Sequence, residues 1–223
     1  MNTINIPVGS VRVRMYDDDR VCLKFKAGGF EPHTLEKWSD LCLAAPVNSL
    51  VMDVGAYTGL YAISAKLLGV DAVAFEPLSF LMKRLCENAS LNNVDVNAWE
   101  VAVSDQEGEE TLYYSSSVPF TSGASFVKVQ ESKLKVRTVT LDSIAAMYKT
   151  KISAIKIDVE KAEDRVLDGA QFILQKYRPE LIVEVLGKPN VKEAMKNKLL
   201  SKLPNYKVGD IFDNRNVWFT PCN

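Results

Sequence analysis

The sequence predicts an α/β fold in which a doubly wound, mostly parallel sheet carries an antiparallel hairpin strand at its C-terminal end. Short β-branched apolar runs alternate with stretches of helical periodicity. A turn with two glycines separates the first of these runs from the helix that follows. Residues 206–220 indicate a closing hairpin with its turn at Asp213-Asn214. Alternating strands and helices form parallel sheets that are covered on both faces.

Composition and charge narrow the class of protein. The 223 residues are 47% hydrophobic and 25% charged, as in one globular domain with a substantial core. A net charge of −1 gives no electrostatic reason to expect nucleic acid or an anionic membrane as a partner. The start lacks the features of a secretory signal. Four scattered cysteines and a single histidine predict reduced thiols, a cytoplasmic location and no bound metal.

The first part of the chain is expected to cover the core. Residues 1–48 predict a hairpin and a capping helix, packed on a cofactor-binding domain of residues 49–223 within a single structural domain. Apolar and polar residues alternate over residues 11–26, on both sides of aspartates 17–19. We expect a hairpin there, with the aspartates as a solvated turn. A helix should follow and end before Pro46.

His33 is the only histidine and directly precedes this expected helix. One interpretation makes His33 a catalytic general base over the mouth of the ligand site. The other makes it a helix-start residue without chemistry. The sequence leaves both interpretations open.

Residues 50–77 predict the unit around which the chain is organised. A buried strand leads into a turn with Gly55 and Gly59, then an apolar helix, then a second strand that ends on Glu76. The glycines would let backbone approach a ligand, and a helix N-terminus favours an anionic group. A carboxylate at a strand end can accept two hydrogen bonds from a ribose diol. This pattern predicts a nucleotide site, against the alternative of an ordinary βαβ unit.

The turn also indicates which nucleotide to expect. Ala56 and Tyr57 stand where the G-x-G-x-x-G pattern of pyrophosphate binders would need a glycine. S-adenosylmethionine, which has a ribose, a carboxylate and a sulfonium but no phosphate, fits better. Asp53 suits its ammonium group or the amides of the turn. The residues expected to bind this cofactor are Asp53, Gly55, Ala56, Tyr57, Thr58, Gly59, Glu76, Pro77, Ala102, Val103 and Asp158.

The middle of the chain predicts a third strand and a more irregular region. The strand is expected over residues 97–103, where the Val103 backbone or Asp105 could bind the adenine amine. Short antiparallel strands are expected at 111–114, 125–129 and 134–140. The hydroxyl-rich residues 115–125 between them are either a lid that admits substrate or an exposed loop.

The fourth parallel strand carries the best catalytic candidates. It covers residues 152–159 and delivers Asp158 and Glu160 at its C-terminal end, the edge at which open α/β sheets bind ligands. Two carboxylates there suit acid–base catalysis or a bound cation, against the alternative of a solvated strand end. Further on, a helix interrupted near Gly169 precedes a fifth strand, and Glu184 near the end of that strand faces the same edge.

Several motifs in this order resemble one family of enzymes, and the match runs from about Glu31 to Glu184. The motifs are Asp53-Val-Gly-Ala-Tyr-Thr-Gly59, Phe75-Glu-Pro77, Asn88 with Asn92, Ala102-Val-Ser104, Thr138-Val-Thr-Leu-Asp142, Lys156-Ile-Asp-Val-Glu160 with Glu163, and Val166-Leu-Asp-Gly169-Ala. Together they resemble the FkbM family of S-adenosylmethionine-dependent methyltransferases, which have a Rossmann-like fold. In one departure, Lys161 stands where the family usually has glycine.

The resemblance implies methylation of a hydroxyl group on a sugar, glycan or small natural product, with S-adenosylmethionine as the methyl donor. Methyl transfer needs close alignment of the acceptor oxygen, and a carboxylate base such as Asp158 or Glu160 would activate it. The alternatives are a methyltransferase that acts on nucleic acid or protein, and a cofactor-binding module without activity. A nicotinamide dehydrogenase is disfavoured by the missing middle glycine.

Overall fold

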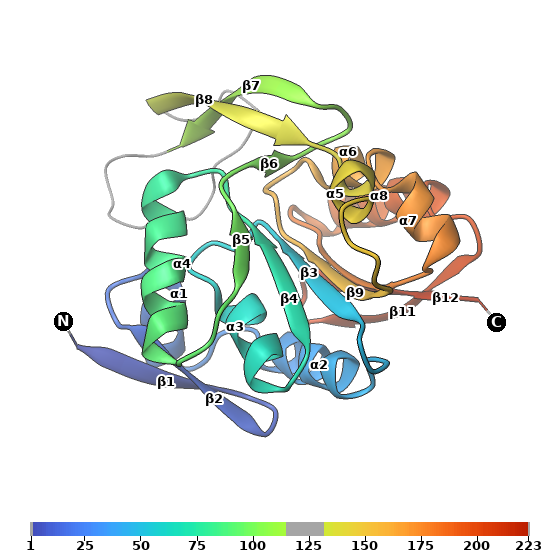
Figure 1. The fold of residues 1–223 in the computed structure, drawn as a ribbon. Helices are drawn as coiled ribbons and strands as arrows, with labels where there is room; N and C mark the ends of the chain where they lie inside the picture. The colour runs from blue at the N-terminus through green and yellow to red at the C-terminus, as the bar shows by residue number, and fades with distance from the viewer. Residues whose placement is uncertain (1, 115–131, 223) are drawn as a thin grey trace.

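The computed structural model describes residues 2–114 and 132–222, and a seven-stranded sheet lies at its centre (Figure 1). Its strands are β3 (Leu50–Val54), β4 (Asp71–Phe75), β5 (Asn97–Trp99), β9 (Ile152–Ile157), β10 (Glu180–Glu184), β11 (Tyr206–Phe212) and β12 (Asn216–Pro221). They are ordered β11-β12-β10-β9-β3-β4-β5. Strand β12 runs antiparallel to both of its neighbours, and the other pairs are parallel. The predicted fold class and its closing hairpin are confirmed.

The two faces of this sheet bury different apolar clusters, because successive side chains of a strand point to opposite faces. In β3, Met52 belongs to one cluster and Val51 to the other. The Met52 side is covered by α5 (Leu141–Ala145), α6 (Glu163–Asp168), α7 (Gln171–Lys176) and α8 (Pro189–Ser201). The Val51 side is covered by α2 (Pro32–Leu43), α3 (Leu60–Leu67) and α4 (Ser79–Leu91). Burial on both faces explains the unbroken apolar runs of these strands.

The N-terminal hairpin lies earlier than the sequence predicted. It consists of β1 (Thr3–Val8) and β2 (Val11–Tyr16), which are paired antiparallel and packed on the cluster that contains Val51. Residues 20–26, expected as the second strand, form the helix α1 (Arg20–Lys26). The chain does turn at Asp17 and Asp18, but the turn does not join two paired strands: it leads from β2 into α1, and Asp19 is fully buried rather than solvated.

A smaller sheet lies beyond the edge of the central one (Figure 1). It consists of β6 (Ala102–Val103), β7 (Gly108–Tyr114) and β8 (Ser132–Val139), with β8 in the middle. The third strand predicted over residues 97–103 is thus divided, since β5 pairs with β4 and β6 pairs with β8. The expected strand at 125–129 and the expected lid at 115–125 lie outside the described residues.

Two sequence-based expectations concern the environment of the protein. All four cysteines lie among the described residues, and none is in a disulfide; Cys22 and Cys42 are buried. Within the part of the chain that the structure describes, no helix has the length and apolar character needed to cross a bilayer.

Candidate active site

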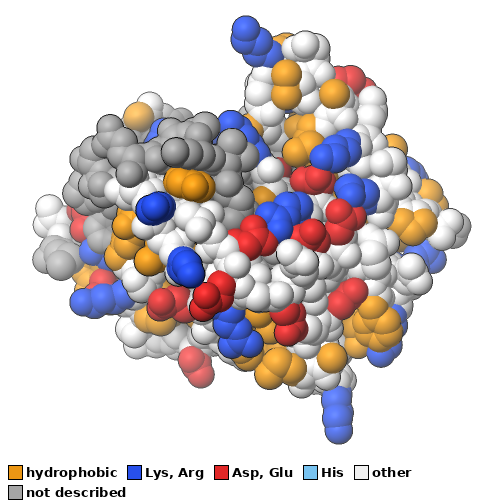
Figure 2. Space-filling view, turned by 90° about the horizontal axis from the view of Figure 1, so that it is seen from above, with side chains coloured by type: hydrophobic (Ala, Val, Ile, Leu, Met, Phe, Trp, Pro, Cys, Tyr) orange, Lys and Arg blue, Asp and Glu red, His pale blue; other side chains and the backbone are white. Residues whose placement is uncertain are grey.

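A pocket opens at the carboxyl ends of β3, β4, β9 and β10. From β3 the strand order continues toward β5, and from β9 it continues in the opposite direction toward β11. Ligands of open α/β sheets bind at the point where the strand order reverses in this way. Figure 2 views the molecule from above, and acidic and basic side chains lie side by side on this face. The pocket extends across the sheet from an apolar end over β4 and β5 to a charged end over β9 and β10.

The apolar end suits a flat aromatic base. Its walls come from the end of β4, the start of α4, the β5–β6 connection and β7, so three layers of the fold contribute to it. The side chains that form it are Phe75, Pro77, Leu81, Val101, Val103 and Leu112. Ala102 also lines this end, so Pro77, Ala102 and Val103 are where the sequence predicted them to be.

Glu76 sits between the two ends of the pocket and is buried. Its Oε2 accepts a hydrogen bond from the Tyr57 amide at 2.9 Å, and its Oε1 accepts one from the Leu78 amide at 2.9 Å. Burial raises the pKa of this carboxyl to about 8. In the ionised form each oxygen keeps one lone pair for a further donor, which is the acceptor pattern that a ribose diol needs. The side chain therefore fits the sugar of S-adenosylmethionine.

The glycine turn has a different physical basis from the one the sequence suggested. Gly55 has φ +81°, and a Cβ added there would lie 1.9 Å from the carbonyl oxygen of Asp158. Gly59 has φ +95°, precedes α3 and does not line the pocket. The amides of Gly55 and Ala56 both donate to Phe75 O. The glycines are thus required by the chain's own close packing, and these amides are already bonded within the protein.

Asp53 lines the pocket below the turn and is almost fully buried. Its Oδ2 accepts a hydrogen bond from the Ala62 amide in the first turn of α3, at 3.0 Å. The donor belongs to the helix after the glycine turn and not to the turn itself, so this bond differs from the expected contact with the turn amides. Burial raises the pKa of Asp53 to about 7.

Three carboxyl groups meet at the charged end of the pocket. Oxygens of Asp158, Glu160 and Glu184 all lie within 4.8 Å of one another. Two cations lie beside them, since Lys156 Nζ is 3.5 Å from Asp158 Oδ2 and Arg215 is bonded to Glu184 Oε1. Such a cluster could hold a metal ion. Two basic side chains already lie beside these carboxyl groups, which favours acid–base chemistry over a bound cation.

The pKa values of the three carboxyl groups are shifted in different directions. Burial opposes ionisation of Asp158, but the Lys156 ammonium lowers its pKa, so Asp158 stays charged. Burial, and next the charge of Asp158, raise the pKa of Glu184. The same two causes raise the pKa of Glu160. Neighbouring carboxyl groups with pKa values moved in opposite directions are typical of acid–base sites.

The turn that carries Glu160 is strained. Glu160 has φ +52° and Lys161 has φ +81°, so two successive side-chain-bearing residues are left-handed. A left-handed conformation costs roughly 1–2 kcal/mol for a residue with a Cβ, and glycine avoids that cost. The Lys161 amide donates to Glu163 Oε1 at 3.0 Å, which fixes the turn from the other side. Glu160 lines the pocket beside Asp158.

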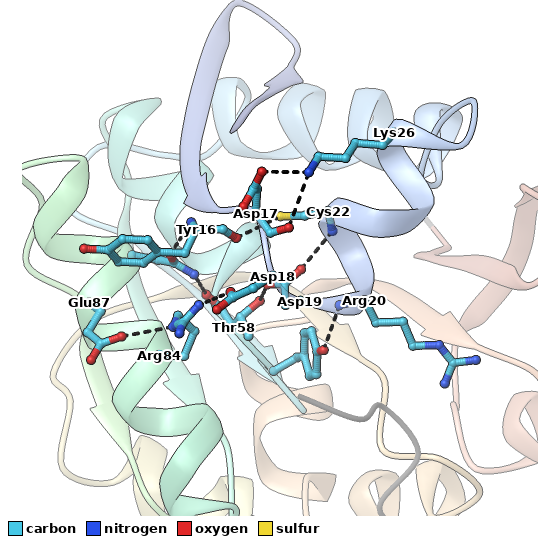
Figure 3. Close-up of polar contacts among 12 residues, drawn as sticks. Tyr16, Asp17, Asp18, Asp19, Arg20, Cys22, Lys26, Thr58, Arg84 and Glu87 are labelled. Atoms are coloured by element: carbon cyan, nitrogen blue, oxygen red, sulfur yellow. Dashed lines mark hydrogen bonds and ion pairs between the residues drawn. The ribbon is translucent and has the colours of Figure 1, made fainter. Parts of the chain in front are cut away.

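The sequence reasoning missed a contact between the N-terminal segment and the glycine turn (Figure 3). Asp19 is the N-cap of α1 and accepts a bond from the Cys22 amide at 2.8 Å. Its other oxygen accepts a bond from Thr58 Oγ1 at 2.6 Å. The Arg20 amide donates to Tyr57 Oη at 3.2 Å. An aspartate before an apolar segment is a helix-start signal, and it could have identified α1.

Two candidates lie away from the pocket. His33 is exposed, its Nδ1 is 2.9 Å from Asp213 Oδ1, and it is not among the residues that line the pocket. The Asp213 hydrogen bond raises the pKa of His33. This position supports the interpretation of a helix-start residue rather than a catalytic base. Asp105 is held by Arg165 and Ser104 and also lies outside the pocket lining, whereas Val103 is part of that lining.

Comparisons of the sequence with known proteins identify related chains. A sequence profile of the methyltransferase FkbM domain matches residues 53–208. The chain is 26% identical to the AMB antimetabolite synthetase AmbE of Pseudomonas aeruginosa, over 72% of this chain and 9% of that protein. The chain therefore corresponds to a small part of this relative.

Solved structures share the fold at low sequence identity. The methyltransferase FkbM from Methylobacillus flagellatus is 18% identical, with a TM-score of 0.52 over 77% of this chain and 43% of that one. The T. thermophilus 16S rRNA methyltransferase RsmC, solved with AdoMet and guanosine, is 11% identical, with a TM-score of 0.57 over 100% of this chain and 50% of that one. The fold is the Rossmann-like fold of S-adenosylmethionine-dependent methyltransferases. With its profile match spanning residues 53–208, the chain belongs to the FkbM methyltransferase family.

Proposed function

We propose that this protein transfers the methyl group of S-adenosylmethionine to a hydroxyl group of a sugar, glycan or small natural product. The observation that carries the proposal is that Glu76, Asp158 and Glu160 line one pocket at the ends of two strands of one sheet. Membership of the FkbM family supports methyl transfer. When bound, S-adenosylmethionine supplies a methyl group activated by its positively charged sulfur.

The apolar end of the pocket and Glu76 would hold the donor. A base between Pro77, Leu81 and Val103 would be shielded from water, and the buried Glu76 would accept hydrogen bonds from the ribose. Since Tyr57 and Leu78 fix both oxygens of Glu76, that carboxyl is oriented before the donor arrives.

The charged end would activate the acceptor. An alcohol is a weak nucleophile until a base removes its proton. Glu160 has a raised pKa and lines the pocket, so it is suited to take that proton near neutral pH. Asp158, which Lys156 keeps charged, would orient the hydroxyl group by accepting a hydrogen bond.

The N-terminal segment belongs to the same site in this proposal. Residues 1–48 supply Arg20, Lys24 and Glu31 to the pocket lining, so they act as a cap on the domain of residues 49–223 rather than as a separate unit. The cytoplasmic location predicted from the cysteines stays a prediction.

The first experiment separates binding from turnover. Calorimetry should show S-adenosylhomocysteine binding to the wild type and about tenfold weaker binding to Glu76→Gln, because a carboxamide cannot accept from both backbone amides. Gly55→Val is unsuited to this test, since its side chain would collide with Asp158 O. Absence of binding to the wild type would refute the proposal.

The second experiment tests turnover with a panel of sugars, glycans, small polyketides and hydroxylated lipids, with tRNA and rRNA included because RsmC acts on rRNA and shares the fold. We expect turnover with a hydroxylated small molecule, and loss of at least a hundredfold in Glu160→Gln and Asp158→Asn. Glu109→Gln, an exposed glutamate outside the pocket, is the matched control. Methylation of RNA alone would refute the acceptor class but not the methyltransferase reaction.

A further inference from the structure

Two basic side chains of α1 face the charged end of the pocket. Arg20 and Lys24 are four residues apart, so they lie on the same side of the helix, and both line the pocket. Arg215, which directly precedes β12, lines the same end. Three cationic groups from distant parts of the sequence therefore face one space.

The position of α1 relative to the pocket is fixed by buried contacts. Asp19 caps the helix and accepts a hydrogen bond from Thr58, and the Arg20 amide donates to Tyr57 Oη. Two neighbouring residues of the glycine turn therefore hold the start of α1. In Figure 3 the Arg20 side chain extends away from these contacts. With the backbone of α1 held in this way, Arg20 and Lys24 line the pocket.

Lys24 has no acidic side chain at ion-pair distance within residues 2–114 and 132–222. No carboxylate of the described residues forms an ion pair with its Nζ, which lies 5.5 Å from the centroid of the Phe30 ring. Burial, then the charges of Arg215 and Arg20, lower the pKa of Lys24. The two arginines thus influence Lys24 more than any acid does.

Arg215 adds a buried donor whose hydrogen-bonding capacity is not used within the described part of the chain. Its terminal nitrogen is bonded to Glu184. Its Nε is buried, lies 3.5 Å from Glu31 Oε1 and makes no hydrogen bond within the described part of the chain. A buried N–H without an acceptor costs about 1–3 kcal/mol, so an acceptor brought by a ligand would be favoured.

We propose that Lys24, Arg20 and Arg215 form a subsite for an oxyanion, a carboxylate or phosphate group carried by a ligand of this pocket. Guanidinium and ammonium groups bind such oxyanions by charge-assisted hydrogen bonds. The proposal rests on the proposed function, in which the pocket takes a methyl donor and an acceptor. The oxyanion is either the carboxylate of the donor or an acidic group of the acceptor, and the test separates these sources.

The test compares Lys24→Gln and Arg20→Gln with the wild type by calorimetry. Lys83→Gln, an exposed lysine of α4 outside the pocket, is the matched control for the loss of one charge. The probes are S-adenosylhomocysteine, 5′-methylthioadenosine, which lacks the carboxylate, and inorganic phosphate. Thermal unfolding of each variant checks that it is folded.

If the subsite takes the donor carboxylate, both pocket variants bind S-adenosylhomocysteine about tenfold more weakly and 5′-methylthioadenosine unchanged. If it takes an acidic group of the acceptor, S-adenosylhomocysteine affinity is unchanged and phosphate binds to the S-adenosylhomocysteine complex about tenfold more weakly. Both results support the subsite.

The proposal is overturned if both pocket variants match Lys83→Gln with all three probes. This outcome is distinct from failure of the proposed function, in which the wild type itself does not bind S-adenosylhomocysteine. In that case the affinity of the free protein for phosphate still tests the subsite. Weaker phosphate binding by Lys24→Gln than by the wild type would support the oxyanion subsite, and equal binding would overturn it.

Discussion

The carboxylate of Asp19 accepts a hydrogen bond from the hydroxyl of Thr58 at 2.6 Å, and this bond joins the N-terminal segment to the turn at the centre of the candidate site. Both side chains are fully buried. Because the bond is buried, its loss should act directly on the position of α1.

Thr58→Val should destabilise the protein by about 1–3 kcal/mol, because it leaves a buried carboxylate with one fewer donor. Urea unfolding at neutral pH measures this change. Thr150→Val is the matched control, since Thr150 is partly exposed and makes no hydrogen bond among the described residues. Equal stability of Thr58→Val and the wild type would contradict the structural role of the bond.

Lys161→Gly should stabilise the protein relative to Lys161→Ala by about 1 kcal/mol, because Lys161 has φ +81° and only glycine adopts that conformation without a steric cost. Both variants remove the same charge, so their difference isolates the backbone. Thermal or urea unfolding gives the comparison. If alanine proved as stable as glycine, the left-handed turn after Glu160 would be in doubt.

Glu76→Gln should make stability less dependent on pH. Burial raises the pKa of Glu76 to about 8 in the folded state, whereas an unfolded glutamate has a pKa of about 4.3. The folded state therefore binds more protons than the unfolded state between these values, and stability falls as pH rises. Removing this group should reduce the fall by roughly 1 kcal/mol per pH unit between pH 5 and 7, measured by urea unfolding. Parallel curves for the variant and the wild type would show that Glu76 does not retain its proton.

Lys156→Met should cost about 3–5 kcal/mol at pH 7, because it leaves the charge of Asp158 without its buried partner. In the wild type, Lys156 lowers the pKa of Asp158, so the stability from this pair is present at neutral pH and is lost as pH falls through the folded pKa. In Lys156→Met the pKa of Asp158 should rise, so the deficit should be smaller at pH 5 than at pH 7.

The double variant Lys156→Met/Asp158→Asn is the control for this prediction. It removes both charges, and it should recover much of the lost stability. A single-variant deficit that is the same at pH 5 and pH 7 would mean that Asp158 is not the group that Lys156 keeps charged.

The sequence was sufficient to predict the strands whose apolar pattern agrees with their burial in the fold. Strands β3, β4, β9 and β10 are buried on both faces, and their apolar runs were visible. A carboxylate at a strand end could be placed at the pocket without knowing any contact, because parallel strands end at one edge. Glu76, Asp158 and Glu160 were predicted in this way.

The N-terminal segment was predicted wrongly because two patterns compete there. Residues 20–26 alternate like a strand, but Asp19 caps a helix and its contact with Thr58 favours that helix. The correct hairpin has Gly9-Ser10 between two apolar strands, a recognised two-residue turn signal that was overlooked. The oxyanion subsite lay beyond the sequence, since nothing local relates Lys24 to Arg215.

The position of β12 has a consequence for how the chain assembles. Strand β12 follows β11 in the sequence but lies between β10 and β11, so β11 has no edge to join until β12 has been synthesised. Until then, the edge of β10 has no partner strand, and its unpaired N–H and C=O groups could pair with a strand of another nascent chain. Translation must therefore run through residues 216–221 before the edge of β10 is covered, and the shorter-lived exposed edge is then replaced by that of β11, the outer strand of the sheet.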